Sequence, residues 1–242
     1  MDVREKSVLI TGANRGLGRA LVTEALNRGA SHVYAGIRDS LDIADPRVTA
    51  VLLDVTSVAQ IAAAAASIPD LDVLINNAGV ASYGGLGNLD SIAAHLAVNL
   101  FGVLNVSRAF LPQLRRSGGA IVNQLSLASI ASVPAMPAYS VSKAAALNLT
   151  QGLRAFLAPE GVSVHSVLLG PIDTDMTRDL DLPKTPANVA ARGIFDGLTA
   201  GDEDIFPDPA SRPVADGWRE GVAKALELQF RAFVPQAAPQ AA

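Results

Sequence analysis

Tyr139 and Lys143 are two residues whose types and spacing could do acid/base chemistry. They are four residues apart in a stretch with helical periodicity, so both side chains project from one face of a helix, one turn apart. A tyrosine has a reference pKa near 10, and work near neutral pH requires that its pKa fall by about three units, or about 4 kcal/mol. A neighbouring ammonium favours the phenolate. The pair indicates a tyrosine acid/base, although the same spacing is common on surface helices.

A glycine-rich turn near the N-terminus could bind phosphate. It follows the apolar run Val8-Leu9-Ile10 and consists of Thr11-Gly12-Ala13-Asn14-Arg15-Gly16-Leu17-Gly18. Glycines in such a turn permit positive φ and let the backbone approach a pyrophosphate, while the amides and dipole of the following helix attract negative charge. The spacing departs from the G-x-G-x-x-G dinucleotide motif, so by itself the turn is equally compatible with an ordinary glycine-rich loop.

The end of the second strand distinguishes NAD from NADP in dinucleotide-binding folds, through an acid for the ribose hydroxyls or an arginine for the 2′-phosphate. Here the strand ends in Ile37-Arg38, with no acid at the discriminating position. Arg38 and Arg15 could hold a phosphate through planar, charge-assisted hydrogen bonds. Asp39 follows directly, so an exposed Arg–Asp pair is the alternative. The pattern favours NADP (NADPH) over NAD.

The elements that must position these residues alternate between short apolar strands and helices. The predicted strands cover residues 8–10, 33–37, 48–53, 73–75, 120–125 and 162–169, and the predicted helices cover 17–28, 59–68, 89–116, 139–157 and 188–198. Strands that are apolar at every position suit a parallel sheet covered on both faces. We therefore expect one α/β domain over residues 1–234, a Rossmann-like doubly wound parallel sheet in three α/β/α layers.

The C-terminal section follows a different pattern. A short apolar piece, Ile205-Phe206, precedes an amphipathic helix expected around Trp218 to Phe233, and residues 235–242 are expected to form a flexible tail. The helix could close the apolar end of a pocket or pack on the sheet. A partner-binding element is the alternative.

Composition narrows the classes of function. Hydrophobic residues make up 50% and charged residues 17% of the chain, and the net charge of −4 comes without a basic cluster, so nucleic acid and membrane surfaces are not expected partners. No stretch approaches the ~20 apolar residues of a membrane span, and a cytoplasmic location is expected. The chain has no cysteine, and His32, His95 and His165 are far apart and interpreted as surface or strand-end residues. No metal site is expected.

Beyond these separate signals, the chain resembles the short-chain dehydrogenases/reductases, in their compact single-domain branch. The resemblance covers roughly the first 180 residues, in the family's order and spacing. It rests on the glycine-rich turn, Asp54-Val55, Asn76-Asn77-Ala78-Gly79, Asn99, Ser126, Tyr139-Ser140-Val141-Ser142-Lys143 and Gly170-Pro171-Ile172-Asp173-Thr174. Each piece is weak alone, but the ordered set is specific.

The resemblance implies a catalytic set of Asn99, Ser126, Tyr139 and Lys143. Ser126 would hold the substrate oxygen against the Tyr139 hydroxyl. Asn99 would distort its helix and position a water that links Lys143 to solvent. Lys143 would also hold the nicotinamide ribose.

The resemblance also implies a cofactor site. Asp54-Val55 and the stretch 77–79 would line the adenine and its ribose, and residues 170–174 would cover the nicotinamide, with Thr174 or the Ile172 backbone holding its carboxamide. The full predicted cofactor-binding set is Thr11, Gly12, Asn14, Arg15, Gly16, Leu17, Gly18, Arg38, Asp54, Val55, Asn77, Ala78, Gly79, Tyr139, Lys143, Gly170, Pro171, Ile172 and Thr174.

The chain departs from the family's pattern in three places. Leu125 stands where many members have a second serine, and Leu169 stands where a proline usually precedes the glycine. Near the C-terminus, Phe206-Pro207-Asp208-Pro209 and an extra helix replace the glycine-rich strand that many members use for tetramer packing. This departure makes a tetramer doubtful, and the resemblance still implies a homodimer through the helices that contain Asn99 and Tyr139.

The expected function is NADPH-dependent carbonyl reduction or alcohol oxidation on a small to medium, mostly apolar ketone or aldehyde. The segments 80–85, 127–136 and 174–186 should build the substrate pocket; inward-pointing Arg178 or Lys184 would contradict an apolar substrate. The alternative from another class is a non-catalytic NADP-binding sensor, which has no evident need for Ser126, Tyr139 and Lys143 together. Epimerase or dehydratase chemistry on nucleotide sugars is disfavoured because the chain has no C-terminal substrate domain.

Overall fold

A single sheet of parallel strands forms the centre of this protein in the computed structural model, which describes residues 1–40 and 42–234. Across the sheet, the order is β3 (Val48–Leu52), β2 (His32–Ile37), β1 (Ser7–Thr11), β4 (Val73–Asn76), β5 (Ala120–Gln124), β6 (Ser163–Val167) and β9 (Asp204–Ile205). This seven-stranded order, with all pairs parallel, confirms the predicted Rossmann-like fold in one domain. The predicted tail, residues 235–242, lies outside the described residues.

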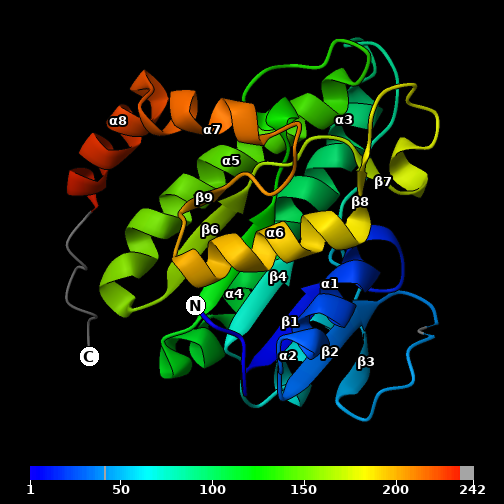
Figure 1. The fold of residues 1–242 in the computed structure, drawn as a ribbon, viewed down its shortest axis with the longest axis vertical. Coiled ribbons are helices and arrows are strands. Elements are labelled where there is room, and N and C mark those ends of the chain that lie inside the picture. Colours follow the sequence, from blue (N-terminus) through cyan, green and yellow to red (C-terminus); the bar gives the residue numbers. More distant parts are fainter. Residues whose placement is uncertain (41, 235–242) are drawn as a thin grey trace.

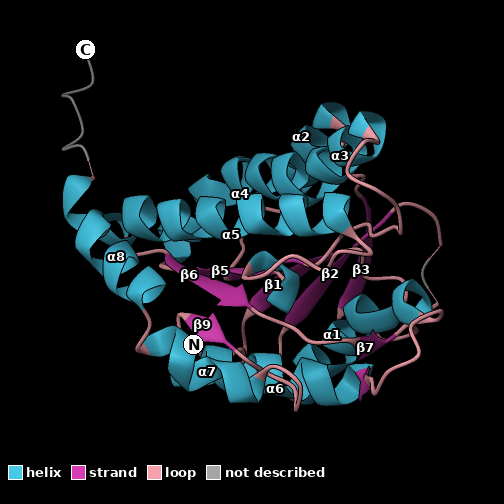
Figure 2. Cartoon of the chain, turned by 90° about the horizontal axis from the view of Figure 1, so that it is seen from above, coloured by secondary structure: helices cyan, strands magenta, loops and turns pink. Residues whose placement is uncertain are grey.

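Helices cover both faces of the sheet (Figure 1, Figure 2). One layer contains α1 (Gly16–Asn27) and α6 (Ala187–Ala200), and the other contains α2 (Val58–Ser67), α4 (Val103–Ser117) and α5 (Pro137–Leu157). Because strand side chains alternate between faces, Val8 and Ile10 pack in the α1/α6 layer, whereas Leu9 packs in the other layer. All three are fully buried, which explains why the strands are apolar at every position.

The predicted helix 89–116 is interrupted. It consists of α3 (Leu89–Leu96), a π-helical segment (Ala97–Gly102) and α4. Asn99 lies inside the π-helical segment, which confirms the helix distortion that the family resemblance implies. Wide turns of this kind occur often at functional sites.

The interrupted helix Leu89–Ser117 also contradicts the expectation about membrane spans. By length and composition alone, Leu89–Ser117 is long and apolar enough to cross a membrane, and it is the single such helix among the described residues. The statement that no stretch approaches a membrane span is therefore wrong by this criterion. In the fold, the run lies in the helical layer and contacts α2, α5 and β4.

The C-terminal helix expected around Trp218 to Phe233 is two helices, α7 (Arg212–Arg219) and α8 (Val222–Phe230), followed by a short 3-10 turn (Arg231–Phe233). Trp218 therefore lies near the end of α7 and not at the start of a helix. Gly221 separates the two helices, where a Cβ atom would lie 2.6 Å from the Gly217 carbonyl oxygen. Trp218 packs with Phe206 and Leu147 beside the edge of the sheet.

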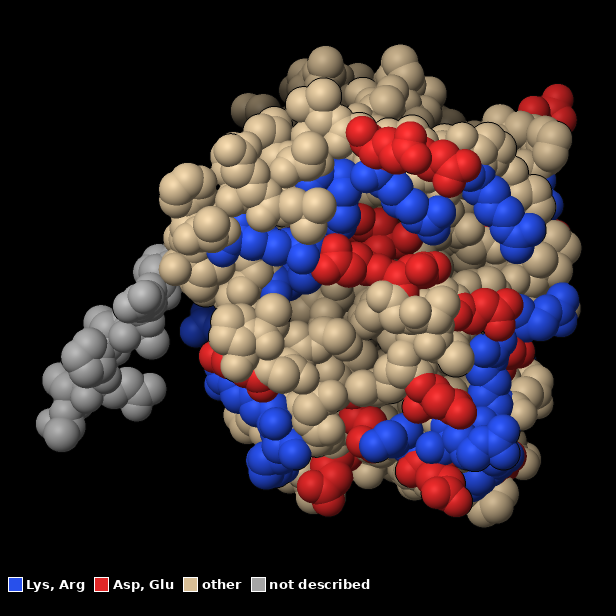
Figure 3. Space-filling view, turned by 60° about the vertical axis from the view of Figure 1, so that its left-hand side comes forward, with Lys and Arg blue, Asp and Glu red and all other residues tan. Residues whose placement is uncertain are grey.

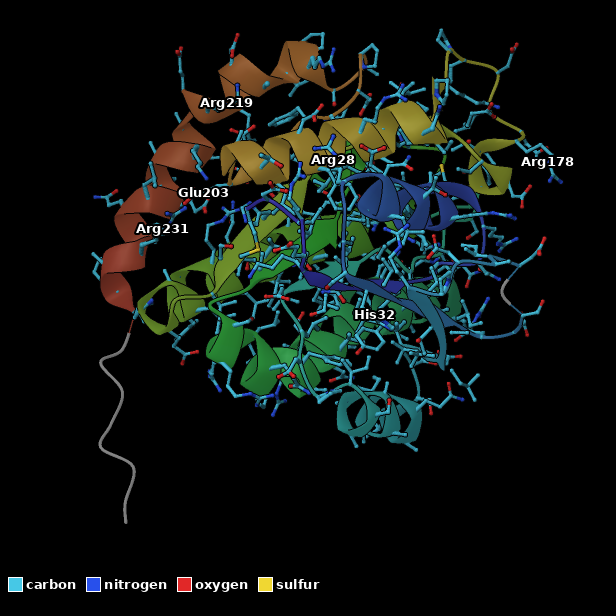
Figure 4. All side chains as sticks on the ribbon, turned by 60° about the horizontal axis from the view of Figure 1, so that its bottom comes forward. Arg28, His32, Arg178, Glu203, Arg219 and Arg231 are labelled. Carbon is cyan, nitrogen blue, oxygen red and sulfur yellow. The ribbon has the colours of Figure 1, made fainter. Side chains whose placement is uncertain are left out.

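A buried network of charges fixes these two helices to the sheet edge. Asp204 in β9 accepts hydrogen bonds from Arg154 of α5 (2.9 Å), Lys224 of α8 (2.7 Å) and the Trp218 indole (3.0 Å). Arg154 also pairs with Glu227. Around this network, Glu203 and Arg231 lie beside each other (Figure 4), and basic and acidic side chains adjoin on this side of the molecule (Figure 3). Paired in this way, the buried charges are compensated.

The interpretation of all three histidines as surface or strand-end residues is wrong for two of them. His95 and His165 are each 4% exposed, and their Nδ1 atoms lie 2.7 Å from the carbonyl oxygens of Ser91 and Asp202. His165 lies in the middle of β6, and burial lowers its pKa. The described residues contain no cluster of three or more histidine, aspartate or glutamate side chains that could hold a metal ion.

Candidate active site

One cavity of about 580 Å³ runs along the carboxyl ends of the strands, where ligands bind in open parallel sheets. Most of the residues singled out from the sequence line it: Gly12, Asn14, Arg15, Gly16, Leu17, Gly18, Arg38, Asp54, Val55, Asn77, Ala78, Gly79, Ser126, Tyr139, Lys143, Gly170, Ile172 and Thr174. Residues far apart in sequence thus meet in one place. Thr11, Asn99 and Pro171 do not line the cavity.

The glycine-rich turn connects β1 to α1 without room for side chains at its closest approaches. Gly12 has φ +66°, and a Cβ atom there would lie 3.0 Å from the Ala78 Cα atom. A Cβ atom at Gly18 would lie 2.0 Å from the Gly12 carbonyl oxygen and 2.7 Å from the side-chain Nδ2 atom of Asn77. The turn therefore requires glycine at both positions, and it packs directly on the loop after β4.

The N-terminus of α1 leaves its amides free for an anion. Arg15 occupies the N-cap position without a side-chain capping bond, and the first turn of α1 contains no acidic residue. First-turn amides without side-chain acceptors, together with the helix dipole, suit a phosphate. With the glycine turn beneath them, these residues fit the pyrophosphate of a dinucleotide.

Thr11 supports this region from behind instead of contacting a ligand. Its side chain is 1% exposed, and its hydroxyl oxygen accepts hydrogen bonds from the backbone amides of Asn77 and Ala78, both at 3.0 Å. Asn77 in turn donates its side-chain amide to the carbonyl oxygens of Thr11 and Gly12, at 2.9 and 3.1 Å. The structure thus gives the Thr11 side chain a positioning role behind the cavity, and its predicted contact with a cofactor stays a prediction.

Two arginines line the cavity beside β2 and the glycine-rich turn. Arg38 follows β2 and is exposed, and the alternative Arg38–Asp39 ion pair is absent from the described residues. Arg15 pairs with Asp175 at 3.4 Å. The pKa of Asp54 is lowered by hydrogen bonds from the Thr56 hydroxyl and backbone amide and by the charge of Arg38. This end of the cavity therefore offers cations for a phosphate and a carboxylate for hydroxyl groups.

Ser126, Tyr139 and Lys143 meet at the opposite end. Tyr139 and Lys143 lie on α5, and the Lys143 ammonium nitrogen lies 5.8 Å from the centre of the Tyr139 ring. Lys143 is 6% exposed and donates to the carbonyl oxygen of Gln124 at 2.6 Å. Ser126 follows β5 and caps a short 3-10 turn, accepting from the Ala128 amide at 3.1 Å. It is therefore both a strand-end cap and a residue of the cavity.

Burial dominates the pKa values of this pair. It raises the pKa of Tyr139, an effect that a hydrogen bond with Ser126 opposes, and it lowers the pKa of Lys143 to about 8. Both shifts have one cause, because a low-dielectric environment disfavours each charged form. In the protein alone, Lys143 does not lower the pKa of Tyr139 below its usual value, in contrast to the expectation from the helical spacing.

Asn99 acts through the backbone that surrounds the cavity. Its side chain donates to the Val80 carbonyl oxygen and the Ser142 hydroxyl and accepts from the Val80 amide, each at 2.9 Å. Ser142 donates in turn to the carbonyl oxygen of Tyr139 at 2.7 Å. Asn99 therefore ties the loop after β4 to the helix that carries Tyr139 and Lys143.

The segment after β6 closes the cavity on one side. Gly170 donates its amide to Asp208 at 3.0 Å, and Asp208, fully buried, also accepts from the Ala210 and Ser211 amides and the Ser211 hydroxyl. The C-terminal departure from the family pattern thus supports the Gly170 loop. Pro171 turns away from the cavity, and its carbonyl oxygen accepts from the Thr185 amide where β7 (Ile172–Asp173) pairs with β8 (Thr185–Pro186).

Neither basic residue of the 174–186 loop lines the cavity. Arg178 is 72% exposed, pairs with Asp175 and extends from the outer edge of the molecule (Figure 4). Lys184 donates to the Arg178 carbonyl oxygen at 3.1 Å. Of the predicted substrate segments, Val80, Ala81 and residues 174–177 line the cavity. This arrangement supports the expectation of an apolar substrate side.

Several residues of the cavity were not singled out from the sequence. They are Gly36, Ile37, Leu53, Thr56, Val98 and Gln124. Many of them lie at or just after the carboxyl end of a strand, so that position, and not residue type, is the signal that could have found them.

Sequence comparison places the chain in a family. The family model described as "short chain dehydrogenase" matches residues 6–184, and the chain belongs to this family. It is an oxidoreductase of the short-chain type. A curated relative, the oxidoreductase UcpA of Salmonella typhimurium, is 32% identical over 196 residues, which cover 75% of this chain and 74% of the relative.

Solved structures extend the likeness over almost the whole chain. A short-chain dehydrogenase from Burkholderia cenocepacia, crystallised in complex with NADP, is 39% identical with a TM-score of 0.87 and covers 97% of this chain and 100% of its own. An NADPH-bound carbonyl reductase from chicken fatty liver is 28% identical with a TM-score of 0.75 and covers 85% of this chain and 100% of its own.

The support that Thr11 provides can be tested by removing its hydroxyl. Thr11→Val should weaken nucleotide binding about tenfold, because two hydrogen bonds of about 1 kcal/mol each hold the 77–78 backbone and part of that energy is lost from the site. Thr11→Ser keeps the hydroxyl and should retain wild-type affinity. Calorimetric titration with NADPH measures both variants, and equal affinities for Thr11→Val and wild type would contradict the positioning role.

Proposed function

We propose that this protein is an NADPH-dependent carbonyl reductase or alcohol dehydrogenase that acts on a small to medium, mostly apolar ketone or aldehyde. The observation that carries the proposal is the arrangement of the cavity. Ser126, Tyr139 and Lys143 lie together at one end, and the phosphate-binding turn and two arginines lie at the other. A dinucleotide that spans these ends would place its nicotinamide beside the tyrosine.

The chain's own residues supply the proton chemistry. When bound, the nicotinamide would transfer a hydride to or from the substrate carbon, and its oxidised form would add a positive charge that favours the phenolate. The Tyr139 hydroxyl would donate a proton to the carbonyl oxygen, or accept one from the alcohol, in the role of general acid/base. Ser126 would hold that oxygen by a hydrogen bond. Lys143 would hold the nicotinamide ribose, and Asn99 would position the water that connects Lys143 to solvent.

The preference for NADPH rests on the end of the cavity that contains Arg15 and Arg38, where the adenine half of the dinucleotide would bind. Arg38 and Arg15 both line the cavity, and guanidinium groups bind phosphate through charge-assisted hydrogen bonds. Arg15 would exchange its exposed contact with Asp175 for the 2′-phosphate at little cost, since exposed ion pairs contribute little. The two structural relatives bound to NADP or NADPH support the same preference.

The likeness to a carbonyl reductase supports the class of reaction. The apolar residues Val80, Ala81 and Met176 line the cavity, and Arg178 and Lys184 are turned away from it, which supports an uncharged substrate. A non-catalytic NADP sensor is the second candidate. The intact arrangement of Ser126, Tyr139 and Lys143 disfavours it, because sensing alone does not need this set. A cytoplasmic location stays a prediction.

Removal of the Tyr139 hydroxyl tests the reaction. With NADPH and a panel of apolar ketones and aldehydes, followed at 340 nm, Tyr139→Phe should lower kcat by about 10²- to 10⁴-fold while the variant still binds NADPH. Tyr34→Phe, in β2 away from the cavity, is the matched control and should keep wild-type turnover. Full turnover by Tyr139→Phe would refute the acid/base assignment. Tight NADPH binding without turnover of any compound would favour the sensor.

Substitution of Arg38 tests the preference for NADPH over NADH. Arg38→Ala should lower NADPH affinity by about 10- to 100-fold, the effect of removing a charge-assisted hydrogen bond, and leave NADH affinity within about twofold. Arg19→Ala is the control, because Arg19 lies on α1 and donates to the Asp42 carbonyl oxygen outside the cavity. Equal losses for NADPH and NADH, or similar wild-type affinities for the two, would contradict the assignment of the 2′-phosphate to Arg38.

A homodimer through α4 and α5 is part of the proposal. The helical layer that contains them exposes large apolar side chains, among them Phe101 (52% exposed), Val141 (42%) and Phe156 (55%). The π-helical segment that carries Phe101 contacts α5. Exposed apolar surface on neighbouring helices is typical of an interface between protein subunits.

Sedimentation equilibrium tests the dimer. Wild type should sediment as a dimer, and Phe156→Glu should shift the population toward monomer, because a buried unpaired carboxylate is costly in an interface. Val58→Glu, at a 74% exposed position of α2, is the control and should leave the dimer intact. A monomeric wild type at all concentrations would refute the proposal.

A further inference from the structure

Gln124 differs from the other buried polar side chains of this protein. It is the last residue of β5, is 5% exposed, and lines the cavity. Neither its Oε1 nor its Nε2 atom has a hydrogen-bond partner within the part of the chain that the structure describes. Asn76 and Gln113 each have one unpaired atom as well, but the Nδ2 of Asn76 and the Nε2 of Gln113 make hydrogen bonds.

An amide with both ends unpaired is costly in a folded protein. A buried donor or acceptor without a partner costs about 1–3 kcal/mol, and the great majority of buried polar atoms are paired. A leucine or methionine would fill the same strand-end position without this cost. The amide of Gln124 is therefore best explained by a partner from outside the chain.

The geometry of β5 shows at which end of the cavity the Gln124 side chain lies. Side chains alternate along β5, and Asn123 donates to Thr150 of α5, so Gln124 faces the opposite side of the sheet together with Val122, which packs in the α1/α6 layer. The backbone carbonyl of Gln124 accepts from Lys143 at 2.6 Å. Gln124 therefore lies at the end of the cavity that contains the acid/base pair.

We propose that the side-chain amide of Gln124 binds the nicotinamide half of the dinucleotide, offering one donor and one acceptor to its carboxamide or ribose hydroxyls. Leu125 and Leu169, which line the same cavity, offer no side-chain polar group. An uncharged amide supplies both kinds of hydrogen bond without a charge beside the reacting centre. This inference rests on the proposed function, since it requires that the cavity bind a nicotinamide nucleotide.

The test compares ligands that contain and lack the nicotinamide. Gln124→Met, of nearly equal size, should raise the Kd for both NADPH and NADH about tenfold, the effect of one or two lost hydrogen bonds. Adenosine 2′,5′-bisphosphate, which lacks the nicotinamide half, should bind the variant and wild type equally. The melting temperature of the ligand-free variant should equal or exceed that of wild type, because two unpaired buried polar atoms have been removed.

Gln113→Met is the matched control. Gln113 donates to the carbonyl oxygens of Ala65 and Ile68 at 3.0 and 3.1 Å, so its variant should melt at a lower temperature and keep wild-type affinity for all three nucleotides.

Four results would overturn the assignment of Gln124. They are unchanged NADPH and NADH affinities, an equal loss of bisphosphate affinity, a drop in melting temperature as large as that of Gln113→Met, or a rise in the ketone KM alone, which would assign the amide to the substrate. A wild type that binds neither NADPH nor NADH would overturn the proposed function and this inference with it.

Discussion

The parallel pairing of all strands in the sheet is the constraint on which the rest of the structure depends. Parallel strands place their carboxyl ends along one edge, so segments that follow different strands meet there regardless of their distance in sequence. Gly12, Asn77, Ser126 and Gly170 each follow a different strand and line one cavity. The glycines make this convergence possible, because a Cβ atom at Gly18 would collide with the Gly12 carbonyl oxygen.

Burial controls the pKa values of the two ionisable groups at the acid/base end of the cavity. It acts in opposite directions on the pKa values of Tyr139 and Lys143, because the charged form is the deprotonated one for tyrosine and the protonated one for lysine. Burial thus shifts both groups toward their neutral forms. A charge brought into the cavity by a ligand would change this balance more strongly than it would in water, since the surroundings screen it poorly.

Support for the cavity comes from residues that do not line it. Thr11, Asn99 and Asp208 are buried, and each uses its side chain to satisfy backbone groups of a segment beside the cavity. Sequence patterns indicated the first two as site residues but could not separate contact from support, since both roles place a polar residue near a strand end or helix face. Asp208 was seen only as part of a departure from the family pattern, because its partner Gly170 is distant in sequence.

The sequence alone determined the alternation of strands and helices and the parallel sheet, because apolar periodicity and glycine requirements are local properties of the chain. Its resemblance to the family indicated most of the site. Only the tertiary structure decided which buried groups find partners. His165 and Gln124 show why. Whether a polar side chain in a strand is paired or unpaired depends on atoms that other segments bring to it, and no pattern within the strand records them.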